Sequence, residues 1–187
     1  SVGGVARSHV AAIDLTTGRA TNFAPTAASL TELALNGGQL FTAGGFFNVQ
    51  GQVRNRLAAF DLTTGALTAW NPSSPVEVTS LSASGGVVYA ALLGSGTIGG
   101  QFRSNLAALD ATTGNATAWN PSPGRALQYV AVDGSRVYIG SQFSNFAVGG
   151  QTRSYAAALD LTTGNALGWA PALNSVMLKH LPTAAGV

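Results

Sequence analysis

Apolar residues in this chain stand in short runs that end at Gly, Asn, Asp, Ser or Thr. One run covers 30–35 and the next covers 40–43, with Gly37 and Gly38 between them. Two such runs around a pair of glycines predict a β-hairpin, because glycine readily adopts the positive φ angles of a tight turn. No stretch keeps the 3.6-residue period of an amphipathic helix. The pattern therefore predicts an all-β protein built from short antiparallel strands.

The order of runs and turns repeats along the chain. The segment Val-Ala-Ala-Ile-Asp-Leu-Thr-Thr-Gly at 10–18 returns in similar form at 57–65, 106–114 and 156–164. Its aspartates are 47, 49 and 50 residues apart. Each has an arginine seven residues before it, an aromatic residue nine after it and a proline two further on. The repeated positions are Arg7, Asp14, Phe23 and Pro25; Arg54, Asp61, Trp70 and Pro72; Arg103, Asp110, Trp119 and Pro121; and Arg153, Asp160, Trp169 and Pro171.

Each repeat contains four short runs with strand character, and four strands per repeat of this length are typical of a propeller blade. We therefore expect a β-propeller of four-stranded antiparallel blades, with about four repeats visible. The units cover 1–25, 26–72, 73–121 and 122–171, and 172–187 starts a further unit. Either the chain ends pair to close a four-bladed ring, or the chain is part of a larger propeller. The second arrangement is favoured because the last segment lacks a complete second strand.

The run from Gly44 to Asp61 and its continuation to Pro72 resemble the bacterial delta-60 repeat. They share its Gly-Gly-x-Phe, Gly-x-x-Arg-x-x-Leu-Ala-x-x-Asp and aromatic-x-Pro series. The resemblance extends over nearly the whole chain and implies a β-propeller without shared catalytic residues, mostly within large exported proteins. The third unit has Leu-Gly-Ser-Gly at 93–96 where Gly-Gly-x-Phe should stand, so we expect its loop to differ.

The segment 59–65 also resembles the repeat of quinoprotein dehydrogenase propellers, which continues with three residues and a tryptophan. Here four residues separate Gly65 from Trp70. A slip of one residue in a strand moves a side chain to the opposite face, so the tryptophan docking of those enzymes is out of register. Such an enzyme would also need more blades and a charged cofactor pocket. We therefore predict that the chain is not an enzyme.

Charged residues make up 9% of the chain, against roughly 25% in an ordinary soluble domain. This composition favours a protein that is extracellular or at the cell surface, with the periplasm as an alternative. The net charge is only +2 and Lys179 is the single lysine, so a phosphate-binding face for nucleic acid is not expected. Cysteine is absent, which excludes disulfides and zinc–thiolate sites. No apolar run approaches the length of a membrane span.

We expect the repeated residues to have structural roles, with a binding role as the alternative for each kind. The four aspartates precede Thr-Thr-Gly and can accept backbone N–H groups in an Asx-turn. One carboxylate per unit is too few for a repeated calcium site, although calcium or sugar binding is the alternative. The four arginines suit backbone carbonyls of a neighbouring blade or the repeated aspartate, unless they line a central channel as an anion-binding ring. The aromatic residues predict packing between blades, with stacking on sugar rings as the alternative.

Little else in the sequence could support catalysis. Glu32 and Glu77 occupy equivalent places in the first strand of their units, so they read as repeat positions and not as an acid–base pair. His9 and His180 stand alone, with no second ligand at a recognisable spacing. No nucleophile elbow, phosphate loop or zinc-protease motif occurs. We therefore predict no catalytic, cofactor-binding or metal-binding residues.

Function is then expected in the variable loops at 46–53, 93–102 and 142–152. Their phenylalanines either cap the blades or form a partner surface. We predict a non-catalytic structural or protein-interaction module whose partners are other subunits or the rest of a larger propeller. A lectin-like propeller that binds glycans is the alternative, and a fragment of a quinoprotein-like enzyme is the second. The candidate surface residues are Phe46, Phe47, Phe102, Phe143 and Phe146.

Overall fold

The computed structural model describes residues 1–2, 4, 6–7, 9–26, 29–171 and 173–175, which contain strands and turns but no helix. The all-β prediction is therefore confirmed for these residues. The strands are β1 (Leu30–Asn36), β2 (Gln39–Gly44), β3 (Asn48–Val49), β4 (Gln52–Val53), β5 (Leu57–Asp61), β6 (Val78–Ser84), β7 (Val87–Ile98), β8 (Gln101–Asp110), β9 (Tyr129–Asp133), β10 (Arg136–Gly140), β11 (Phe146–Val148), β12 (Gln151–Arg153) and β13 (Ala156–Asp160).

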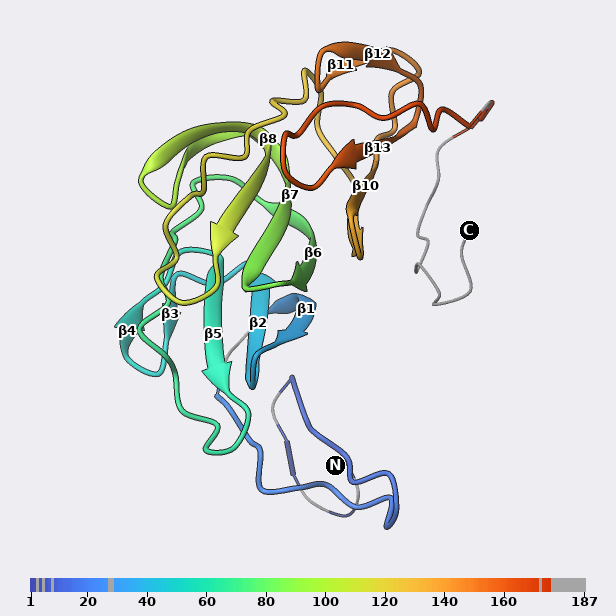
Figure 1. The fold of residues 1–187 in the computed structure, drawn as a ribbon. Helices are drawn as coiled ribbons and strands as arrows, with labels where there is room; N and C mark the ends of the chain where they lie inside the picture. The colour runs from blue at the N-terminus through green and yellow to red at the C-terminus, as the bar shows by residue number, and fades with distance from the viewer. Residues whose placement is uncertain (3, 5, 8, 27–28, 172, 176–187) are drawn as a thin grey trace.

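The second, third and fourth units each form a three-stranded antiparallel sheet, in the orders β1-β2-β5, β6-β7-β8 and β9-β10-β13. The sheets follow one another in chain order, and β1 lies beside β6 (Figure 1). In each sheet the middle strand pairs with the strand that ends in the repeated aspartate; Gln39, for example, lies opposite Asp61. A glycine turn sets the register between β1 and β2, where Asn36 lies opposite Gln39, and its Gly37 and Gly38 have φ angles of 56° and 77°.

Each of these units carries a second hairpin, at a place where the sequence predicts a variable loop. β3 pairs with β4, β11 pairs with β12, and in the third unit the far ends of β7 and β8 pair from Ser95 to Ser104. The third unit thus differs from its neighbours in having long continuous strands here. The glycine pairs at 99–100 and 149–150 form the turns and have positive φ angles. They are the sequence signal that could have predicted these hairpins.

The fourth strand of each blade is much shorter than expected. It forms a single bridge, such as Phe60 with Leu67, in place of a ladder. The chain makes backbone bonds on either side of that bridge, from Asp61 N to Ala66 O and from Thr68 N to Ala59 O. The ladder then stops because the carbonyl of Thr68 accepts a hydrogen bond from the Arg54 guanidinium. The second, third and fourth units are therefore three-stranded sheets with a one-bridge fourth segment.

The first unit is incomplete among the described residues. Its segment 10–14 was predicted as a strand but makes only the bridge between Ile13 and Ala20. Among the residues that the structure describes, no middle strand lies beside this segment. Leu62 in the second unit donates its N–H to Gly38 O, whereas Leu15, its counterpart, is 99% exposed. The further unit expected at 172–187 lies outside the described residues except for 173–175.

The core lies between the sheets. Alternate residues of β5 face opposite neighbours: Ala59 packs toward the third unit, while Ala58 and Phe60 pack toward the first. The sheets of the second and third units are therefore packed on both faces, which explains why their inner strands read as continuous apolar runs and not as a polar–apolar alternation. The small alanines let adjacent sheets approach closely. Clusters of this kind fill all three junctions between the four units.

Candidate functional site: the seam between units

The repeated aspartate organises a rigid turn. Asp61 Oδ1 accepts hydrogen bonds from the N–H groups of Thr63 and Thr64, at 3.0 and 2.7 Å, and from the Thr64 hydroxyl at 2.8 Å. Gly65 N donates to Asp61 O at 2.8 Å, and its φ of 71° is the left-handed value that glycine allows. Asp14, Asp110 and Asp160 make the same set of bonds. We refer to each as an aspartate turn.

These bonds also fix the charge state of the turn. Hydrogen bonds from the backbone and hydroxyl of the second threonine lower the pKa of all four carboxyl groups below the ordinary value of 3.8. The carboxylates are therefore held in the ionised, acceptor-only form that the turn requires. In each turn these bonds go to Oδ1, and each unit contributes one such carboxylate, which is fewer than the several oxygen ligands that a calcium ion requires.

An aromatic-x-Pro segment of one unit covers the aspartate turn of the next. Trp70 Nε1 donates a hydrogen bond of 2.9 Å to Asp110 O, and Gly99 N donates one of 2.8 Å to Pro72 O. A Cβ atom at Gly114 would lie 3.2 Å from Pro72 N, so glycine allows this close approach. We call this contact, an aromatic-x-Pro segment on an aspartate turn, the seam.

The seam recurs at the other junctions. Between the third and fourth units, Trp119 Nε1 donates to Asp160 O at 2.9 Å, and Gly149 N donates to Pro121 O at 3.1 Å. Between the first and second units Phe23 takes the place of tryptophan. Its ring lies 4.0 Å from the position of a Cβ at Gly65, but it has no N–H to donate.

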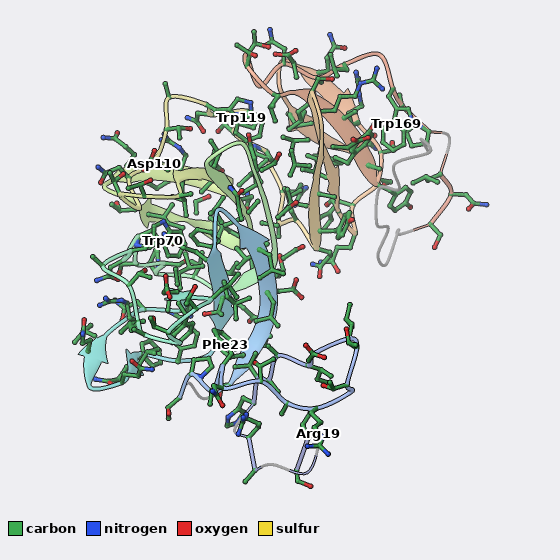
Figure 2. All side chains as sticks on the ribbon, turned by 60° about the horizontal axis from the view of Figure 1, so that its bottom comes forward. Arg19, Phe23, Trp70, Asp110, Trp119 and Trp169 are labelled. Carbon is green, nitrogen blue, oxygen red and sulfur yellow. The ribbon has the colours of Figure 1, made fainter. Side chains whose placement is uncertain are left out.

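Each tryptophan of the seam is held edge-on by an aromatic residue of the middle strand. The ring centroids are 5.0 Å apart for Phe41 and Trp70, and 5.4 Å apart for Tyr89 and Trp119. Trp70 is 1% exposed and Trp119 is 8% exposed. Neither ring has a face available to stack on a sugar, so these residues pack the junction between units. Their positions at a junction are shown in Figure 2.

The repeated arginines bond within their own unit. Arg54 Nη1 donates to Val53 O at 2.9 Å and Nη2 donates to Thr68 O at 2.8 Å. Arg7, Arg103 and Arg153 repeat this pattern, each reaching a carbonyl fourteen residues further on. The expected partners, a carbonyl of a neighbouring blade or the repeated aspartate, are therefore wrong. The segment that follows the aspartate turn of the same unit supplies the carbonyl instead, from Thr68 in the case of Arg54. Burial lowers the pKa of the Arg54 and Arg103 guanidinium groups, although arginine keeps its charge in proteins.

The two glutamates are not equivalent. The register places Glu32 opposite Ala43 and Ser80 opposite Ala91, so the counterpart of Glu32 is Ser80. β1 and β6 each contain a β-bulge at the equivalent place, between Leu30 and Glu32 and between Val78 and Ser80, so the correspondence follows from strand register and could not be read from the sequence. Glu77 precedes β6 and lines an open hollow of about 410 Å³ together with Arg56. Glu32 is not among the residues that line this hollow, so the two carboxyl groups do not form a pair.

The five phenylalanines of the expected partner surface have different environments. Phe46 and Phe146 are 4% and 2% exposed and belong to the core, which agrees with the packing alternative and not with a partner surface for these two. They pack inward because their segments form hairpins that return onto the sheets. Phe143 is half-buried beside Arg125. Phe47 and Phe102 are 59% and 64% exposed, and the Arg56 guanidinium lies 4.9 Å from the centre of the Phe47 ring.

Within the described ranges, no group of three His, Asp or Glu side chains is placed to hold a metal ion. The same part of the chain contains no helix long and apolar enough to cross a membrane. His9 is exposed, and His180 and Lys179 lie outside the described residues. The recurring polar contacts of the described residues are those of the seam, of the aspartate turns and of the repeated arginines.

A scan against protein-family models found no match, and no curated protein matches the sequence. Among solved structures, the computationally designed protein Ika4 is similar, with a TM-score of 0.54 and 16% identity over 79% of this chain and 76% of that chain. The designed protein Ika8 gives a TM-score of 0.51 and 15% identity over 75% of this chain, which spans only 36% of the length of Ika8. At this identity the likeness concerns the fold alone.

A europium-containing methanol dehydrogenase also aligns, with a TM-score of 0.44 and 17% identity over 76% of this chain and 25% of that chain. This alignment is too loose to support an argument about fold or activity.

Proposed function

We propose that the chain is a non-catalytic structural and protein-interaction module built from β-propeller-type blades. The observation that supports this most strongly is the use of the repeated polar groups. The aspartate carboxylates bond within their turns, the arginines bond carbonyls of their own unit, and two indole N–H groups bond the next unit. These groups hold backbone in place, which supports a structural role for the repeated residues.

The second hairpins of the units, such as β3–β4 and the far ends of β7 and β8, offer contact positions for other protein. Phe47, just before β3, and Phe102, on β8, expose most of their side chains. Val53, on β4, is 66% exposed. Exposed aromatic residues in a weakly charged surface favour association. The low charge content is also the basis for proposing an exported or cell-surface location.

The test is the mass and composition of the native particle that contains this chain, purified gently after mild cross-linking. We expect a particle larger than one chain that includes other protein, and we expect Phe47→Ser with Phe102→Ser to remove that protein while the circular dichroism spectrum is unchanged. Phe46→Ser is the matched buried variant and should impair folding. A native particle that contains only isolated chains, with or without these substitutions, would overturn the proposal.

A further inference from the structure

The open hollow of about 410 Å³ lies where the second unit meets the third. It sits near the start of two neighbouring strands, because β1 begins beside it and Glu77 directly precedes β6. Its volume is within the range of small-molecule sites. Two hydroxyl groups, two glycines and two opposite charges line it, from Ser29, Thr31, Gly44, Gly45, Arg56 and Glu77.

The two charged side chains of the hollow do not pair with each other. Arg56 Nη1 donates to the carbonyls of Ser74 and Pro75, at 3.3 Å each. These carbonyls lie three and two residues before Glu77, so the guanidinium is held on the Glu77 side of the hollow. Among the described residues, nothing accepts a hydrogen bond from Arg56 Nε or Nη2. This edge of the guanidinium remains available for the two-pronged contact that arginine makes with a carboxylate.

Arg56 is already held in place by its own unit. The Phe47 ring centre lies 4.9 Å from the guanidinium carbon, and the Arg56 backbone has a φ angle of 61°. This left-handed conformation belongs to the fold, since Asn105 and Tyr155 at the equivalent places have φ angles of 60° and 62°. Asparagine tolerates it better than arginine does, so the backbone gives no reason for an arginine. What distinguishes the second unit here is the guanidinium itself.

The absence of a side chain at Gly45 leaves the hollow open. A Cβ at Gly44 would clash with Ser29 O, so glycine is required there by a close approach. A Cβ at Gly45 would lie 3.8 Å from Ser29 Cβ, which is an ordinary contact, and the φ angle of Gly45 is not positive. Packing and backbone therefore do not require glycine at position 45. At the next junction Leu92 and Leu93 hold the two positions, and Leu92 is fully buried.

The next junction also lacks both charges. Strand register places Asn105 at the position of Arg56 and Ala126 at the position of Glu77. The charged hollow is therefore a feature of one junction and not of the repeat. The other units also supply a residue that the fold already accepts at each of these places.

We propose that this hollow binds a small zwitterion of the α-amino acid type. The carboxylate of the ligand accepts hydrogen bonds from the Arg56 guanidinium, and its ammonium group donates to the Glu77 carboxylate. A ligand with both charges satisfies both groups, whereas a simple anion is repelled by Glu77 and a simple cation by Arg56. This inference goes beyond the proposed function, because a small-ligand site does not depend on a protein partner.

The experiment measures the binding of free amino acids to the purified chain by saturation-transfer NMR. The common amino acids are tested singly at millimolar concentration. The strongest binder is then compared with its N-acetyl and carboxamide derivatives, which each lack one of the two charges. We expect at least one amino acid to bind saturably. Each derivative should bind about ten- to hundredfold more weakly, the loss expected for one charge-assisted hydrogen bond.

Three substitutions taken from the other units test the assignment of the site. Arg56→Asn and Glu77→Ala each remove one charge, and Gly45→Leu fills the hollow with the residue found at position 93. Each should weaken binding by at least about tenfold, while the circular dichroism spectrum is unchanged. Arg136→Asn, which replaces an exposed arginine outside the hollow, is the matched control and should bind as the unmodified chain does.

Several results would overturn the proposal. One is that no free amino acid binds to the unmodified chain. Others are that a derivative lacking one charge binds as tightly as the amino acid itself, or that all three variants keep full affinity. None of these results bears on the native-particle test of the proposed function, because that test detects other proteins and not a small ligand.

Discussion

The indole nitrogen of Trp70 donates a hydrogen bond of 2.9 Å to the backbone carbonyl of Asp110, forty residues further along the chain. Replacing Trp70 with Phe keeps most of the ring but removes this donor. We expect a loss of about 1–2 kcal/mol in the free energy of unfolding, because a buried carbonyl loses a partner. Trp169→Phe should cost less than half as much in the monomer. Urea unfolding followed by circular dichroism measures the unfolding free energy of both variants. Equal losses would show that the hydrogen bond of the seam contributes nothing to stability.

The first seam allows the reverse experiment. The Phe23 ring has no N–H, and among the described residues the Gly65 N–H is the turn donor to the Asp61 carbonyl. Phe23→Trp should supply the missing donor and raise the unfolding free energy by about 1 kcal/mol. The opposite substitution, Trp119→Phe, is the natural comparison and should lower it by a similar amount. A destabilised Phe23→Trp variant would mean that the first seam is too narrow for an indole.

Two adjacent glycines in the third unit differ in what surrounds them. A Cβ at Gly99 would lie 2.4 Å from Ala116 N and 2.7 Å from Gly114 O, whereas a Cβ at Gly100 would meet nothing within 4 Å. Both residues have positive φ angles. Gly99→Ala should therefore cost about 2–5 kcal/mol through backbone clash and conformational strain, and Gly100→Ala about 1–2 kcal/mol through strain alone. Thermal unfolding would rank them, and similar midpoints would contradict the tight packing at Gly99.

The arginine of each unit should not be replaceable by lysine. Arg54 uses two guanidinium nitrogens to bond two carbonyls, and lysine has a single nitrogen on a flexible stem. Arg54→Lys should lower the unfolding free energy by about 1–3 kcal/mol. Arg136→Lys, at an exposed position at the start of β10, should change it by less than about 0.5 kcal/mol. Chemical denaturation provides the comparison, and a harmless Arg54→Lys would argue against the fork-shaped contact.

Acid should weaken the seam through the aspartate turns. The folded-state pKa of each turn carboxyl is lowered by its threonine hydrogen bonds. The stability that this provides is fully present above the unfolded-state pKa and is lost as the pH falls through the folded-state value. The thermal midpoint should thus hold steady from pH 7 to about 5 and decline below about pH 4. Asp110→Asn should flatten that decline, whereas Asp133→Asn, outside the turns, should leave it unchanged.

Features governed by local contacts could be predicted from the sequence. The hairpin between the first two strands of a sheet is predicted by a glycine pair such as Gly37-Gly38. The aspartate turn is also local, because it closes within five residues. Features that depend on a distant or missing neighbour could not. The shortened fourth strand depends on a guanidinium that takes the carbonyl of Thr68, and the burial of Phe146 depends on a hairpin taken for a loop. The segment 10–14 has the composition of a strand, yet it pairs at one position. A β-strand forms only where a neighbouring strand supplies its hydrogen bonds, and the described residues contain none beside this segment.

The acceptor side of the seam consists of a main-chain carbonyl and a glycine, with no side chain that is specific to one unit. Any unit that ends in an aromatic-x-Pro segment therefore suits any unit that begins with an aspartate turn. A gene encoding such a chain that gains or loses whole repeats through unequal recombination keeps the seam at the new boundary, whereas the bonds from Thr79 and Ser80 to carbonyls of the fourth unit need a matching neighbour. The same property would let a protein engineer reorder, insert or graft units as interchangeable modules.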